Sequence, residues 1–104
     1  MELEIGRHDV HVDETLREHI ERRVEFALGQ FGDFVSRVKV SLADVNGPRR
    51  GIDKECQLLV YLRGGHLVKV ADVDGDFAAV VSRAADRAGH AVARQLDRLR
   101  DRKA

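Results

Sequence analysis

Two runs of alternating apolar and polar residues, 54–63 and 66–73, meet at the glycine pair Gly64 and Gly65. An alternation with a period of two is typical of a half-buried strand, and adjacent glycines favour a tight turn. The segment therefore predicts a β-hairpin with one face in the core. The residues of its first strand that share the core face are Cys56, Leu58, Val60 and Leu62.

The same alternation predicts two more strands. A short strand is expected around Leu3 and Ile5, which alternate with glutamates, and a longer one at residues 35–42, where every second residue from Val38 is apolar. Residues 43–53 contain asparagine, glycine and proline, which predict a turn-rich loop.

Apolar residues at spacings of three and four predict two helices. Asp13 can cap the first, which is expected to end near Gly29 and Gly32, and the Asp-Gly-Asp sequence at 74–76 precedes the second. The predicted inner stripes are Leu16, Ile20, Val24, Ala27 and Phe31, and then Phe77, Val81, Ala84, Ala88, Val92, Gln95 and Leu99.

The predicted order of elements is strand, helix, three strands, helix. The economical way to bury both helix stripes is an α+β sandwich of two layers, with two antiparallel helices on one face of a four-stranded sheet and the other face wet. A length of 104 residues suits one domain, 1–104, in which the final residues 101–104 are expected to fray.

The composition argues against a membrane or secreted protein. No apolar run approaches the roughly 20 residues that span a bilayer, and residues 1–10 lack the features of a signal peptide. Cys56 has no second cysteine with which to form an internal disulfide, and we expect it to be a buried, inert thiol. We therefore expect a cytoplasmic protein without a membrane partner.

The chain is neutral overall, but its charge is divided unevenly. Residues 83–104 contain seven basic and three acidic side chains, a net charge of +4, which leaves −4 for residues 1–82. At 100° per residue, one outward ridge of the second helix about 22 Å long collects four arginines and a histidine, and arginine suits paired contacts to phosphate. The ridge consists of Arg83, Arg87, His90, Arg94 and Arg98.

An alternative interpretation of the ridge stays open. It can be an ordinary solvated helix face with internal ion pairs, such as Arg94 with Asp97 or Arg98 with Asp101. Leu59 and Tyr61 on the wet sheet face are similarly interpreted as a small apolar patch that can support self-association.

No catalytic, metal or cofactor motif emerges from the sequence. The five histidines include no pair at helical spacing with a carboxylate partner, and Gly64 and Gly65 precede no phosphate-binding helix. We expect no enzymatic activity, cofactor, metal or small-molecule substrate.

Several segments together resemble the ribosome hibernation promoting factors, also called protein Y or ribosome-associated sigma-54 modulation proteins. The opening LEIGRHDVHVDETLREHI resembles that family's first strand and the acidic-x-Leu-Arg start of its first helix. The later DFAAVVSRAADR is similar to the aspartate-aromatic-Ala-Ala sequence that starts the family's second helix. The sequence ARQL at 93–96 also resembles that family. The resemblance covers nearly the whole chain.

The resemblance implies a fold akin to double-stranded RNA-binding domains and a binding position in the small ribosomal subunit, where it would inhibit translation by occupancy under stress. The resemblance is to the short type of the family, so we expect no carboxy-terminal dimerisation domain. Basic residues of both helices contact ribosomal RNA in that family, and the matching positions are Arg23, Arg87 and His90, with Arg22 beside them. If His90 must be charged to contact phosphate, affinity rises as the pH falls through about 6.5.

The first helix departs from the family's lysine-rich pattern. Four glutamates occupy it and Phe26 stands where a lysine is expected, so repulsion from phosphate is predicted. This motivates a second hypothesis, a protein-interaction or stress-signalling module of the same fold that has lost ribosome binding and uses its acidic first helix against a basic protein partner. The glutamates are Glu14, Glu18, Glu21 and Glu25.

Overall fold

The computed structural model describes residues 1–8, 10–45 and 54–103, and confirms the predicted order of elements. The elements are β1 (Glu2–His8), α1 (Glu14–Leu28), a short 3₁₀ helix η1 (Gly29–Phe31), β2 (Val35–Asp44), β3 (Lys54–Leu62), β4 (Leu67–Asp74) and α2 (Phe77–Lys103). Most of the loop predicted at 43–53 lies outside the described residues, and α2 includes three of the four residues expected to fray.

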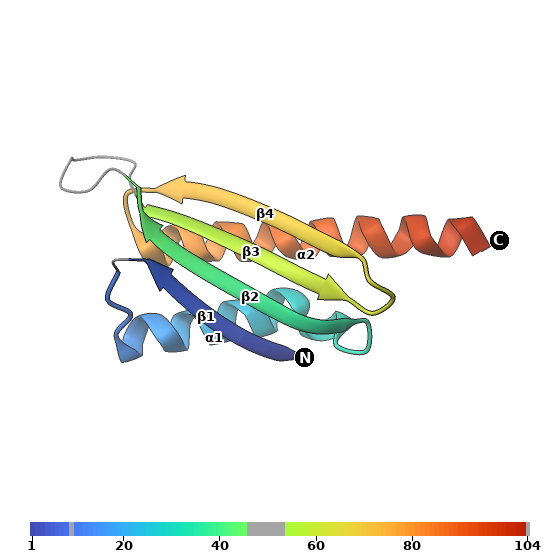
Figure 1. Ribbon diagram of the computed structural model, residues 1–104, viewed down its shortest axis with the longest axis horizontal. Coiled ribbons are helices and arrows are strands. Elements are labelled where there is room, and N and C mark those ends of the chain that lie inside the picture. Colours follow the sequence, from blue (N-terminus) through green and yellow to red (C-terminus); the bar gives the residue numbers. More distant parts are fainter. Residues whose placement is uncertain (9, 46–53, 104) are drawn as a thin grey trace.

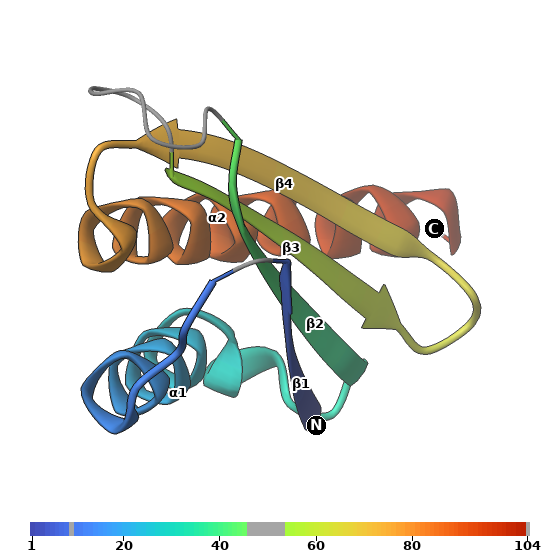
Figure 2. The same ribbon diagram turned by 60° about the vertical axis from the view of Figure 1, so that its left-hand side comes forward.

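The four strands form one sheet in the order β1-β2-β3-β4. β1 pairs with β2 in parallel, and the other two pairings are antiparallel. Both helices lie on the same face of this sheet (Figures 1 and 2), which confirms the two-layer α+β architecture.

The two helices run in the same direction, so the prediction that they are antiparallel was wrong (Figure 1). Successive α1 positions meet successive α2 positions: His19 contacts Ser82, and Arg23 contacts Asp86. The strand pairings explain the direction. β1 and β4 point the same way, and each of α1 and α2 turns back along the strand that precedes it.

The core lies between the sheet and the helices. The inner residues of β3 are fully buried, as the alternation predicted, and α1 contributes Ile20, Val24 and Leu28. α2 presents small side chains to the layer, which let its backbone lie close to its neighbours. Its buried apolar residues are Val80, Val81, Ala84, Ala85, Ala88 and Val92.

Local side chains fix where the helices and the hairpin begin. The carboxylate of Asp13 accepts a hydrogen bond of 2.8 Å from the backbone N–H of Leu16, and that of Asp76 accepts one of 2.9 Å from Ala79. In the β3–β4 turn, both Gly64 and Gly65 adopt φ +91°, a conformation that other residues rarely adopt. The hydrogen bond to Asp13 confirms the predicted cap, and the glycine turn between β3 and β4 confirms the predicted hairpin.

Candidate nucleic-acid interface

The two helices are in close backbone contact at Gly89. A Cβ atom at this position would lie 2.9 Å from the carbonyl oxygen of Ala27, so only glycine allows this contact without a shift of the backbone. Between the two helices, the exposed surface therefore has backbone atoms and small side chains at its base.

Polar side chains join the two helices on the amino-terminal side of that contact. His19 Nε2 donates a hydrogen bond of 2.9 Å to the carbonyl oxygen of Ala78 and lies 3.0 Å from Ser82 Oγ. One turn further along, the guanidinium of Arg23 donates to the carboxylate of Asp86 at 2.7 Å. Arg23, a predicted RNA-binding residue, is thus already partly neutralised by α2.

A hollow of ≈ 190 Å³ follows along the same seam. Phe26 stands at its edge with 76% of its surface exposed, and the guanidinium of Arg23 lies 5.3 Å from the centre of its ring. His90 belongs to the wall contributed by α2. The complete lining is Phe26, Ala27, Gln30, Phe31, Asp86, Gly89, His90 and Ala93.

The acidic side chains of α1 lie on its other flank. At 100° per residue, all four glutamates are about 140–180° around the helix from Arg23, which faces α2. Each is exposed, and none forms an ion pair with another side chain in the described ranges. The predicted repulsion from phosphate therefore applies to the far flank of α1 and not to the seam between the helices.

The basic ridge of α2 divides into two parts. Its first part, Arg83 and Arg87, turns onto the edge strand β4. Arg83 donates to Asp72 at 2.7 Å, to Asp74 at 3.1 Å and to the carbonyl oxygen of Val73 at 2.9 Å. Arg87 donates to the same Asp72 carboxylate at 3.2 Å and to the carbonyl oxygen of Ala71 at 3.0 Å. We call Asp72, Asp74, Arg83 and Arg87 the β4 clasp.

The clasp shifts the ionisation of its members. Hydrogen bonds from Arg83 lower the pKa of Asp72 and of Asp74, and Arg87 adds to the effect at Asp72. The same bonds raise the pKa of Arg83 above its ordinary value. The carboxylates are therefore charged at neutral pH and compete with any phosphate for these arginines.

The second part of the ridge faces solvent. His90, Arg94 and Arg98 are exposed, and the Arg98 guanidinium donates to Gln95 Oε1 at 2.6 Å. Arg94 makes no ion pair with a described residue, and the same holds for the exposed Arg22 of α1. Neither ion pair considered from the sequence is present among the described side chains. Asp97 pairs with Arg100 at 2.6 Å instead of Arg94, and Arg98 donates to Gln95 instead of Asp101.

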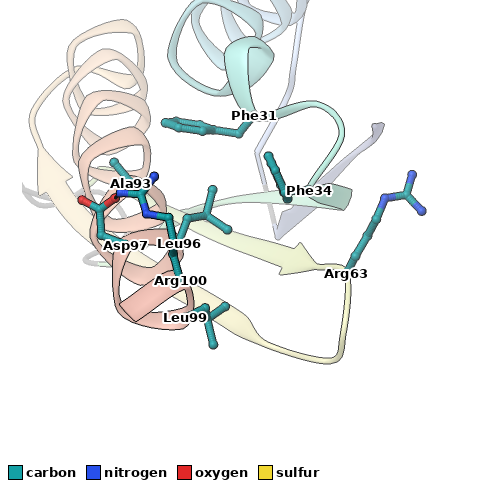
Figure 3. A pocket seen from close by; sticks show the side chains of 8 residues that line it. All are labelled: Phe31, Phe34, Arg63, Ala93, Leu96, Asp97, Leu99 and Arg100. Atoms are coloured by element: carbon teal, nitrogen blue, oxygen red, sulfur yellow. Dashed lines mark hydrogen bonds and ion pairs between the residues drawn. The ribbon is translucent and has the colours of Figure 1, made fainter. Parts of the chain in front are cut away.

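A larger hollow of ≈ 500 Å³ lies near the carboxy-terminal end of α2 (Figure 3). Phe31 and Phe34 face Leu96 across it, while Arg63 extends outward from the end of the β3–β4 hairpin. Arg63 Nε donates to the carbonyl oxygen of Asp33 at 2.8 Å, so this arginine serves local structure. Most of the residues that line this larger hollow are apolar.

The remaining residues considered from the sequence, Cys56 and Tyr61, pack against other parts of the protein. Cys56 is fully buried as predicted, and burial, followed by the charges of Asp72 and Glu55, raises the pKa of its thiol to about 12. On the wet sheet face, the Arg37 guanidinium lies 4.4 Å from the centre of the Tyr61 ring, which it partly covers. No cluster of three or more histidine, cysteine or acidic side chains suited to a metal occurs within the described ranges.

Comparison with protein families assigns the chain. The family model described as sigma 54 modulation protein / S30EA ribosomal protein matches residues 3–103.

The chain belongs to this family.

Solved structures agree with the assignment to the sigma 54 modulation protein / S30EA ribosomal protein family. The protein Y N-terminal domain of Thermus thermophilus has a TM-score of 0.73 and 25% sequence identity, over 90% of this chain and 98% of that one. A ribosomal subunit interface protein from Coxiella burnetii has the same TM-score at 18% identity, over 97% and 99%, and so supports the fold. No curated protein sequence matches the chain.

The described helices include no segment whose length and apolar character would let it span a lipid bilayer.

Sequence reasoning missed the acidic half of the β4 clasp. Asp72 and Asp74 continue the alternation of Val68 and Val70, so they lie on the sheet face that carries α2. That period was readable in the sequence and could have indicated two carboxylates facing the helix. Which arginines meet them depends on how α2 crosses β4, which no local pattern encodes.

Proposed function

We propose that this protein is a non-catalytic factor that binds ribosomal RNA of the small subunit and inhibits translation by occupancy under stress. Membership of a family of ribosome-associated proteins supports the ribosome as the partner. Binding to ribosomes would also place the protein in the cytoplasm.

The observation that carries the proposal is the seam between the parallel helices. It exposes His90 and Arg94 without a carboxylate partner among the described residues. Arg22, also without an ion pair there, lies at the outer edge of the seam, about 100° around α1 from Arg23 and next to Glu18 and Glu25. Cations on two neighbouring helices can contact phosphates on both sides of one seam. We assign the first contacts to these three residues, with Arg98 beyond them. Arg23, Arg83 and Arg87 contribute only where phosphate displaces their aspartates.

The test is co-sedimentation with purified small ribosomal subunits at low and moderate salt. The variant Arg22→Glu/Arg94→Glu reverses two charges on the seam. The matched control Arg7→Glu/Lys69→Glu reverses two exposed charges on strands β1 and β4, away from the seam. We expect salt-sensitive binding, with a slope of roughly −0.7 to −0.9 per phosphate neutralised, that is lost in the seam variant and kept in the control.

Inhibition is tested separately by adding each protein to a cell-free translation reaction. The wild type and the control should lower protein synthesis, and the seam variant should not. Equal binding by the seam variant and the control would overturn the assignment of the interface. No binding by the wild type at any salt would overturn the proposed function itself.

A second function is favoured by the exposed flank of α1. Glu14, Glu18, Glu21 and Glu25 form one unpaired acidic stripe among the described side chains, which suits a basic protein partner. A pull-down from nuclease-treated lysate, with these four glutamates changed to glutamine as the control, tests it. Retention of one partner that depends on the stripe, without ribosomal RNA, would favour this alternative.

A further inference from the structure

We infer that Phe26 is a stacking platform for an unpaired nucleobase of the bound RNA. This inference rests on the proposed function and adds to it a class of ligand, a single-stranded nucleotide, and a contact that phosphate attraction alone does not supply.

The first argument is the position of the ring. Phe26 is the most exposed of the large apolar side chains in the described ranges, at 76%, although it lies beside a hollow that could have buried it. The Arg23 guanidinium lies over one face of the ring, and the high exposure leaves the opposite face open to solvent. Such faces on RNA-binding surfaces stack on unpaired bases, because every base has a complementary π-face.

The second argument is the charge around the ring. Arg22 and Arg23 lie four and three residues before Phe26, so they occupy the same side of α1, and His90 stands on the opposite wall of the hollow. The Arg23 guanidinium is 5.3 Å from the ring centre. Arg22 has no carboxylate partner among the described side chains, and Arg23 can contact phosphate where the phosphate displaces Asp86. A nucleotide offers phosphates to these arginines and a base to the ring.

The third argument is the shape of the seam. Gly89, Ala27 and Ala93 line the hollow without long side chains, and at Gly89 even a Cβ atom would meet the backbone. A flat base can therefore enter edge-on beside Phe26. Gln30 and Asp86 lie in the same lining and offer groups that hydrogen-bond base edges.

The chain contains no tryptophan, which allows a direct optical test. In Phe26→Trp the single indole reports on stacking through quenching of its fluorescence. The matched control is Phe34→Trp, because Phe34 is also exposed, at 54%, but lines the other hollow (Figure 3). The probes are small ribosomal subunits, a 12-nucleotide oligouridylate, and heparin, a polyanion without bases.

We expect subunits and oligouridylate to quench Phe26→Trp, heparin at equal bound fraction not to quench it, and Phe34→Trp to remain unchanged. In co-sedimentation, Phe26→Leu should lower the affinity for subunits about five- to a hundred-fold, while Phe26→Tyr should keep it. Urea unfolding confirms that each variant folds.

The two proposals fail differently. Binding of subunits by Phe26→Trp without quenching, or full affinity in Phe26→Leu, would overturn the stacking role and leave ribosome binding intact. Quenching by oligouridylate without binding of subunits would support the stacking role and overturn the ribosome as the partner. Equal quenching by heparin, or failure of the wild type to bind any of the three probes, would overturn the stacking role.

Discussion

The guanidinium of Arg23 lies 2.7 Å from the carboxylate of Asp86, directly across the seam between α1 and α2. Both side chains are partly exposed, and ion pairs of this kind contribute little to stability. The pair has a larger effect on binding, because it withholds one cation from any phosphate that approaches the seam.

Replacing Asp86 should therefore strengthen RNA binding at a small cost in stability. Asp86→Asn is expected to lower the free energy of unfolding by less than about 1 kcal/mol and to raise the affinity for small subunits several-fold. Urea unfolding and co-sedimentation measure the two effects. Asp33→Asn makes the same charge change away from the seam and should leave affinity unaltered; an equal rise in both variants would point to net charge instead.

The β4 clasp predicts a pH dependence of stability. The pKa of Asp72 is lower in the folded chain than in the unfolded chain, chiefly through Arg83, so its stabilising effect is present above the unfolded value of about 3.9 and is lost as the pH falls through the folded value. Asp72→Asn should lower the free energy of unfolding by about 1 kcal/mol at pH 7.

Urea unfolding from pH 7 to pH 2 checks this prediction. The difference between wild type and Asp72→Asn should be constant near neutrality and should shrink below about pH 4, where the wild-type carboxylate becomes protonated. A difference that stays the same down to pH 2 would show that Asp72 acts by packing and not by charge.

Cys56 should be unreactive in the folded protein. Its thiol is buried and its pKa is raised to about 12, so very little thiolate forms at pH 8. A disulfide reagent such as DTNB should label it only after urea unfolds the chain. Because the folded pKa is the higher one, the stabilising effect of the neutral thiol is complete below the unfolded value and fades as the pH rises toward 12. Rapid labelling without urea would contradict this burial.

Gly89→Ala should destabilise the helix pair. Alanine improves helix propensity by about 1 kcal/mol, but its Cβ would lie 2.9 Å from the Ala27 carbonyl oxygen, and overpacking of this kind costs about 1–3 kcal/mol. We expect a net loss of up to about 2 kcal/mol in urea unfolding. Gly6→Ala is the matched control, since its Cβ would have no neighbour nearer than 3.8 Å, and a larger loss there would contradict the role of Gly89.

Local patterns predicted most of the fold, because a buried face repeats at a period that the sequence records directly. The Asp13 cap, the turn at Gly64 and the core face of β3 all follow from residues close in sequence. The direction of the helices did not follow, because it depends on β1 pairing in parallel with β2, a contact between residues about 35 positions apart.

The candidate site was less predictable for the same reason. Helical geometry correctly predicted that His90 and Arg94 are exposed on α2. It could not show that Arg83 and Arg87 bend toward β4, because an outward position on a helix wheel does not reveal the edge strand beside it. Phe26 was recognised as unusual, but its place beside the hollow depends on α2.

Asp72 acts as a counterion that the chain supplies to itself. When an arginine reaches a phosphate, a cation leaves the RNA, and the gain in entropy drives much of ordinary nucleic-acid binding. If Arg83 and Arg87 both left the clasp for phosphates, the uncovered carboxylates of Asp72 and Asp74 would attract cations in turn, and the net release would be small. The salt dependence of binding should therefore report fewer charges than the basic helix contains. The clasp therefore lowers the attraction for polyanions in general, and a larger share of the affinity must come from a site that matches the protein's shape.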